Sequence, residues 1–102
     1  MSGSYSTPER ALSEAARYVR EVLDCHELAT QDAETSFEGA VPWSTVLRIM
    51  EDIGIDEPVT PPSELTELWT VLFRNVGGQE VVHVTLAFGS DGKLCAAGLY
   101  AS

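Results

Sequence analysis

The fold of this chain is decided by the stretch EVVHVTLAF at residues 80–88. From Val82 onward its side chains alternate, with one set formed by Val82, Val84, Leu86 and Phe88 and the other by Val81, His83, Thr85 and Ala87. β-Branched residues repeating with a period of two are typical of a β-strand that buries one face. We therefore predict a strand here, with the set that contains Phe88 turned toward the core.

A glycine pair, Gly77-Gly78, precedes this strand. Two glycines suit a two-residue hairpin turn, because both central positions of such a turn need positive φ. Folding the chain about this turn gives three apolar pairs: Trp69 with Leu86, Val71 with Val84, and Phe73 with Val82. Cross-strand pairs of this kind stabilise a sheet, so we predict that the segment before the glycines is an antiparallel strand.

Segment 61–76 also fits a helix, because its apolar residues recur at helical spacing and Thr60-Pro61 has the composition of a helix start. We favour a single helical turn at 61–67 followed by a strand. A lone hairpin is marginal in water, whereas three strands with an apolar face are stable. The third strand is predicted at 93–101, after the turn signal Ser90-Asp91-Gly92.

Two helices are predicted before the sheet, each with an apolar stripe. The first begins at Thr7-Pro8, with the threonine as N-cap, and runs to about Leu28, after a loose tail at 1–6. The second runs from Pro42 to Ile53. Between them, residues 29–40 are interpreted as a polar acidic connector that Phe37 pins to the core.

These elements predict one α+β domain over residues 1–102. In it, two N-terminal helices pack on one face of a C-terminal three-stranded antiparallel meander. The order of a helix followed by a meander is loosely similar in architecture to cystatin-like cone folds, and this likeness implies no function.

The composition is that of a globular chain, with 44% apolar residues. The first residues hold no apolar run, and no stretch approaches the roughly 18 apolar residues of a membrane-spanning helix. The two cysteines and two histidines show no metal-ligand spacing, and we find no catalytic motif. We therefore expect a cytoplasmic, non-enzymatic protein with reduced thiols, without a cofactor, a metal site or catalytic residues.

The charge is strongly segregated. The net charge is −10, and the span from Asp24 to Glu67 holds eleven acidic residues and one arginine, whereas the rest of the chain holds five acidic and five basic residues. Such a balance argues against nucleic acid or an anionic membrane as a direct ligand. It indicates either a solvated surface that maintains solubility or a docking surface for a basic partner. We assign the docking surface to Glu34, Glu38, Glu51, Asp52, Asp56, Glu57 and Glu64.

The second face of the predicted sheet has no helix left to cover it, and an uncovered, largely apolar face is typical of an interface. We assign this interface to Leu72, Arg74, His83, Thr85 and Tyr100. The alternatives are an ordinary half-wet face and a ligand or catalytic site built from His83, Thr85 and Tyr100.

The leading hypothesis is a small acidic interaction protein of the inhibitor, immunity or antidefence type. Its expected partner is a basic protein, such as an enzyme that handles nucleic acid, because the whole excess of charge lies in one span. One alternative is a cone-like α+β domain that binds a small ligand or carries an active site between sheet and helices. Another is a homodimeric accessory subunit that is joined through the open sheet face.

Overall fold

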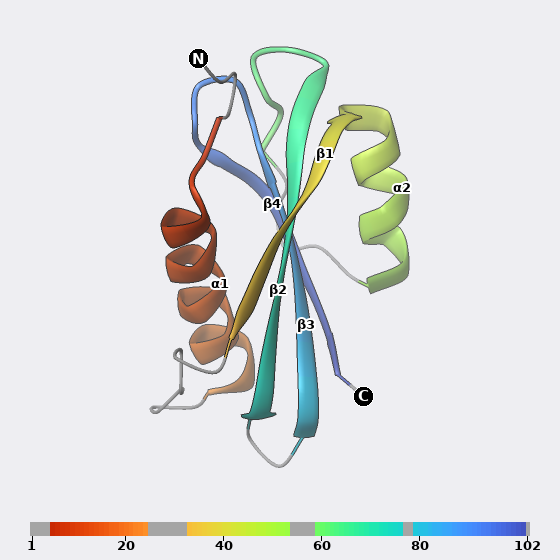
Figure 1. Ribbon diagram of the computed structural model, residues 1–102. Coiled ribbons are helices and arrows are strands. Elements are labelled where there is room, and N and C mark those ends of the chain that lie inside the picture. Colours follow the sequence, from red (N-terminus) through yellow and green to blue (C-terminus); the bar gives the residue numbers. More distant parts are fainter. Residues whose placement is uncertain (1–4, 25–32, 54–58, 77–78, 102) are drawn as a thin grey trace.

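The computed structural model describes residues 5–24, 33–53, 59–76 and 79–101. Along the chain the elements are α1 (Pro8–Leu23), β1 (Glu34–Pro42), α2 (Trp43–Ile53), β2 (Leu65–Val76), β3 (Gln79–Phe88) and β4 (Leu94–Ala101). The strands form one antiparallel sheet in the order β1-β2-β3-β4, with a helix on each side of it (Figure 1). The α+β class and the antiparallel sheet are thus confirmed.

The predicted pairing of the two central strands is confirmed. In the β2–β3 ladder Trp69 lies opposite Leu86, Val71 opposite Val84, and Phe73 opposite Val82. Their shared face forms the main core, in which Phe73, Val82 and Val84 are fully buried. The turn at residues 77–78 lies outside the described residues. The predicted third strand is confirmed as β4.

Segment 61–76 contains a strand and not a long helix, and the single helical turn that we predicted at 61–67 is wrong. β2 already begins at Leu65, directly after a bend at 62–64. Prolines at 61 and 62 disfavour helical backbone in the residues that precede them, while β2 gains ladder bonds on both sides, to β1 and to β3. The strand β2 therefore begins shortly after the two prolines, at Leu65.

The acidic connector predicted at 29–40 is wrong from Glu34 onward, where the chain forms β1. This strand pairs with β2 from Glu34 opposite Leu72 to Pro42 opposite Leu65, and the register shifts between Phe37 and Gly39. Such a bulge inserts one extra residue and bends the strand. Gly39 has φ 112°, a conformation that glycine adopts without a steric cost. In the part of the chain that the structure describes, the sheet therefore has four strands and not the predicted three.

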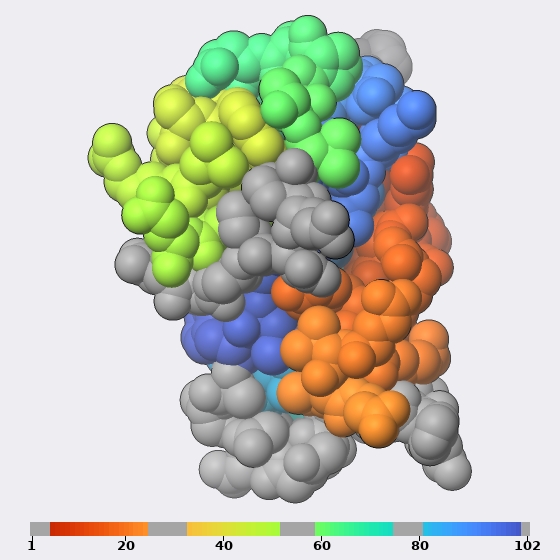
Figure 2. Space-filling model, turned by 180° about the vertical axis from the view of Figure 1, so that it is seen from behind, coloured from red at the N-terminus to blue at the C-terminus, as the bar shows by residue number. Residues whose placement is uncertain are grey.

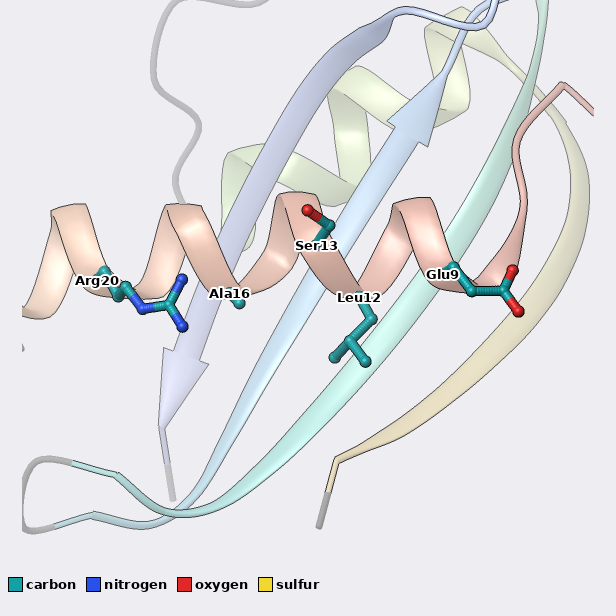
Figure 3. A pocket seen from close by; sticks show the side chains of 5 residues that line it. All are labelled: Glu9, Leu12, Ser13, Ala16 and Arg20. Atoms are coloured by element: carbon teal, nitrogen blue, oxygen red, sulfur yellow. The ribbon is translucent and has the colours of Figure 1, made fainter. Parts of the chain in front are cut away.

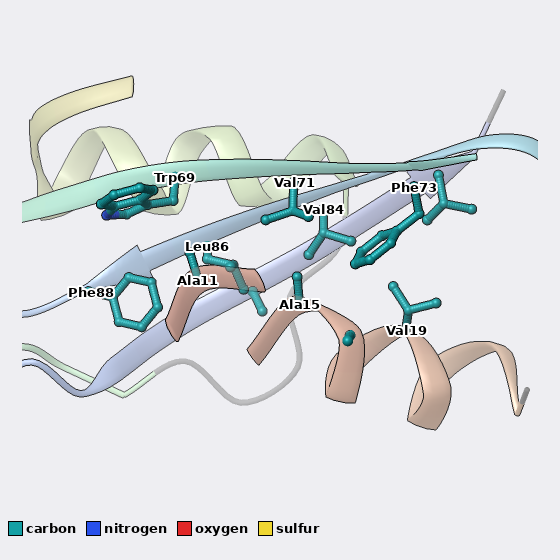
Figure 4. Close-up of a cluster of buried hydrophobic side chains, with 12 residues drawn as sticks. Ala11, Ala15, Val19, Trp69, Val71, Phe73, Val84, Leu86 and Phe88 are labelled. Carbon is teal, nitrogen blue, oxygen red and sulfur yellow. The ribbon is translucent and has the colours of Figure 1, made fainter. Parts of the chain in front are cut away.

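The two helices cover opposite faces, so the prediction that both pack on one face is wrong. α1 lies on the Trp69 face through a flat side of small residues, and Figure 4 shows this core. It consists of Ala11, Ala15, Ala16, Val19, Trp69, Val71, Phe73, Val82, Val84, Leu86, Phe88 and Ala97. On the other face Val46 and Met50 of α2 pack against Ala87 and Ala96, which are small enough to let the helix approach closely.

The ends of α1 follow from local chemistry. The Thr7 side chain accepts a hydrogen bond from the Arg10 amide at 3.2 Å, as predicted for an N-cap. The helix ends at Leu23, earlier than the predicted Leu28, because Asp24 adopts the left-handed conformation that terminates helices. Ahead of the helix, the Tyr5 amide donates to the buried Glu67 carboxylate at 2.7 Å, which ties this part of the N-terminal segment to β2.

The first testable prediction concerns the core strand. Val84→Asp places an unpaired carboxylate at a fully buried position, which should cost several kcal/mol of a total stability of roughly 5–15 kcal/mol. Urea unfolding should therefore show a protein that is largely unfolded in buffer. Ser90→Asp, at an exposed turn position, is the control and should leave the midpoint nearly unchanged. A cooperatively folded Val84→Asp protein would refute this packing.

A second prediction tests the position of α2. Met50→Ala removes a fully buried side chain from the α2 core, and such truncations cost about 2–5 kcal/mol. Glu51→Ala, one residue further and exposed, should change stability by about 0.5 kcal/mol or less. Equal unfolding midpoints for the two variants would show that α2 does not pack on the Ala87 face.

Candidate functional site

One row of residues crosses all four strands on the face that α2 only partly covers. We call it the outer row, and from β1 to β4 it consists of Glu34, Leu72, His83 and Tyr100. α2 covers another row on this face, where Leu68, Ala87 and Ala96 lie. In the outer row Tyr100 is 46% exposed, Glu34 is exposed, and the other two residues are half-buried.

The centre of the outer row is an aromatic pair. The rings of His83 and Tyr100 are parallel, with an interplanar angle of 1° and centroids 4.5 Å apart. Stacking holds both side chains in place and presents a flat, amphipathic surface. Between this pair and α2 the face is closed, because Thr85 is 7% exposed and Gly98 is buried. The expectation that Thr85 lies on an open face is therefore wrong.

β1 brings acidic groups to the outer row. The Glu34 carboxylate accepts from the Arg74 guanidinium at 2.9 Å, and Glu38 accepts from the Thr70 hydroxyl at 2.7 Å. Both bonds run to side chains of β2 on the face of Leu72. We call Glu34 and Glu38 the β1 carboxylates. The structure thus places two predicted docking residues next to Leu72 and Arg74, and on the same face of the sheet as His83 and Tyr100.

The remaining predicted docking residues do not join this group. Glu64 caps α2, since its carboxylate accepts from the Ser44 amide at 3.2 Å and its carbonyl from the Trp43 amide at 2.6 Å. Glu51 is exposed on α2. Asp56, Glu57 and the side chain of Asp52 lie outside the described residues. Glu64 therefore has a structural role that the charge count alone did not reveal.

Phe37 and Trp69 form a second aromatic contact, on the α1 face. Phe37 of β1 is 51% exposed, and its ring centroid lies 5.1 Å from that of Trp69. The buried indole nitrogen of Trp69 has no hydrogen-bond partner among the described residues. Sequence reasoning expected Phe37 to pin a loop to the core. The exposed half of its ring was not foreseen, because a lone phenylalanine in a polar stretch does not reveal how much of it is buried.

A groove of about 290 Å³ follows one flank of α1, lined by Glu9, Leu12, Ser13, Ala16 and Arg20 (Figure 3). Its floor is apolar and its two charged side chains lie at opposite ends. In the parts of the chain that the structure describes, no group of three or more His, Cys, Asp or Glu side chains is arranged to hold a metal ion. No described helix is both long enough and apolar enough to cross a membrane.

Cys95 is a buried free thiol at the start of β4. Its sulfur donates to the Lys93 carbonyl at 3.6 Å. Burial raises the pKa of Cys95, and the nearby Asp91 carboxylate raises that pKa further. The neutral thiol is therefore favoured in the folded protein, and a group of this kind is unsuited to act as a thiolate nucleophile.

Comparison of the chain with models of protein families, with curated proteins and with solved structures finds no match. We therefore infer the function from the geometry and charge of the site.

A third prediction concerns the Cys95 thiol. Its stabilising contribution should be fully present below the unfolded thiol pKa of about 8.5 and should be lost as the pH rises through the raised folded pKa, because the unfolded chain releases this proton more readily. Urea midpoints measured from neutral to alkaline pH should fall more steeply for the wild type than for Cys95→Ala. Parallel pH profiles of the two proteins would contradict a raised pKa.

Proposed function

We propose that this chain is a non-enzymatic, cytoplasmic interaction protein of the inhibitor type that binds a basic protein partner. The observation that carries the proposal is that the β1 carboxylates share one face of the sheet with the partly exposed aromatic pair of the outer row. The docking surface consists of Glu34, Glu38, Leu72, Arg74, His83 and Tyr100.

This surface has the chemistry of a protein interface. Such interfaces combine an apolar, aromatic centre with a polar rim, and Tyr and Arg are enriched in them. Here His83 and Tyr100 supply the aromatic centre, Leu72 adds apolar area, and the β1 carboxylates form one side of the rim. The net charge of −10 favours a basic partner, because opposite charges steer the encounter and reject acidic competitors.

The ion pair between Glu34 and Arg74 does not prevent docking. Both side chains are about half exposed or more, at 64% and 47%, and exposed ion pairs contribute little stability. A basic side chain of a partner can therefore share the Glu34 carboxylate at a small cost.

The alternative of a homodimer through this surface meets an electrostatic obstacle. In a two-fold interface the same patch meets itself, so four β1 carboxylates would gather in one interface with only two Arg74 guanidinium groups. A second copy therefore fits less well than a basic partner. The alternative of a small-ligand or enzymatic domain has one supporting feature, the groove along α1, whose volume is near the lower limit of ligand pockets.

A fourth prediction tests the charged rim. Glu34→Gln/Glu38→Gln removes two charges and keeps the shapes, so the association rate with the co-purified native partner should fall roughly tenfold at low salt and should lose salt dependence. Stopped-flow or surface-based kinetics at several salt concentrations measure this change.

The matched control is Glu14→Gln/Glu21→Gln, which removes two carboxylates that pair with Arg17 on α1, on the opposite side of the sheet. This control should keep the wild-type association rate and salt dependence. The proposal is wrong if the two double variants behave alike or if the native partner is acidic. Sedimentation of the protein alone distinguishes a homodimer, which would appear as twice the chain mass.

A further inference from the structure

The outer edge of β1 is the feature that extends the proposed function. β1 is the first strand of the sheet, and among the residues that the structure describes it pairs with β2 alone. All of its side chains from Ser36 to Glu38 are exposed, as is that of Glu34. An edge strand presents a row of backbone donors and acceptors to which another extended chain can be added.

The opposite edge of the sheet is less suitable. The Val59 amide donates to the Cys95 carbonyl at 2.7 Å, so the connector after α2 already bonds to the edge of β4. Seen from behind, β4 lies between α1 and α2 (Figure 2), and Cys95, Ala96 and Ala97 are buried. The start of the β4 edge is therefore already bonded, and we take the β1 edge as the site of strand addition.

The two sides of β1 differ in chemistry. On the outer-row side lie the β1 carboxylates, with Ser36 between them. On the α1 side lie Thr35 and the exposed ring of Phe37. Leu12 and Glu9 extend from α1 toward the side on which β2 and β1 run (Figure 3), and α1 contacts β1. Among the described residues, the apolar groove is lined by α1 residues alone, and it lies on the flank of α1 from which Leu12 extends.

We propose that β1 accepts an extended segment of the basic partner as a fifth strand of the sheet. Because side chains of a strand alternate between faces, the segment carries basic residues beside Glu34 and Glu38 and apolar residues beside Phe37, toward the groove of Leu12 and Ala16. This inference rests on the proposed function, and it specifies how the partner is recognised.

The same features limit what can be added. The carboxylates repel a second copy of β1, since like charges that face each other across strands are destabilising. The bulge between Phe37 and Gly39 bends the strand, and Pro42 cannot donate to a ladder. The added strand therefore pairs mainly with residues 34–37. Along this short edge, a segment in which basic and apolar residues alternate fits best.

The test uses two nonapeptides with uncharged, blocked ends, each of which contains five lysines and four valines. One alternates lysine and valine, and the other carries all its lysines before its valines. The Trp43→Phe variant leaves Trp69 as the single tryptophan, so its fluorescence reports on the contact with Phe37. The alternating peptide should bind roughly 3- to 30-fold more tightly than the block peptide, and backbone amides within residues 34–37 should gain protection from hydrogen exchange.

A charge swap provides the specific control. Glu34→Lys/Glu38→Lys should lose the lysine peptide and should bind a peptide that alternates glutamate and valine, which the wild type rejects. Equal binding of the alternating and block lysine peptides, binding without protection of residues 34–37, or no binding of either peptide overturns strand addition. The proposed function fails by a different result, when Glu34→Gln/Glu38→Gln leaves association with the native partner unchanged.

Discussion

The pairing of β2 with β3 is the interaction on which the rest of the structure depends. Three cross-strand pairs, Trp69 with Leu86, Val71 with Val84 and Phe73 with Val82, fix the register, and a shift by one residue would turn every one of these side chains to the opposite face. Both neighbouring strands then take their register from this pair. The outer row is a direct consequence, because Leu72 and His83 are opposite each other only in this register.

The central hairpin was predictable because its two strands carry large apolar residues at a period of two. The strand β1 was not predictable in this way, because an edge strand that is covered by a helix on only one side needs few apolar residues. Its stretch from Glu34 to Glu38 offers only Phe37 as a large apolar side chain, and its carboxylates look like those of a loop. Pairing with β2 supplies the stability that the local sequence does not show.

The position of α2 was missed for a related reason. The second face of the sheet was predicted to be uncovered because both helices were assigned to the other face, and its residues under α2, Ala87 and Ala96, are too small to have indicated a helix above them. Small side chains contribute little to a hydrophobic pattern, yet they allow Val46 and Met50 to approach the sheet closely, and all four residues are buried. Among the described residues, the second face is therefore exposed mainly at the outer row, where the side chains are larger and more polar.

In the proposed strand addition, the β1 carboxylates would have opposite effects on acidic and on basic strands. Natural sheets protect their edges with charged side chains, bulges and prolines, and β1 has all three in Glu34 and Glu38, the shift after Phe37, and Pro42. Protection by carboxylates differs from protection by lysines, because it excludes acidic and identical strands while it attracts basic ones. In the strand addition that we propose, this pair of glutamates would therefore both disfavour pairing between copies and favour a basic segment.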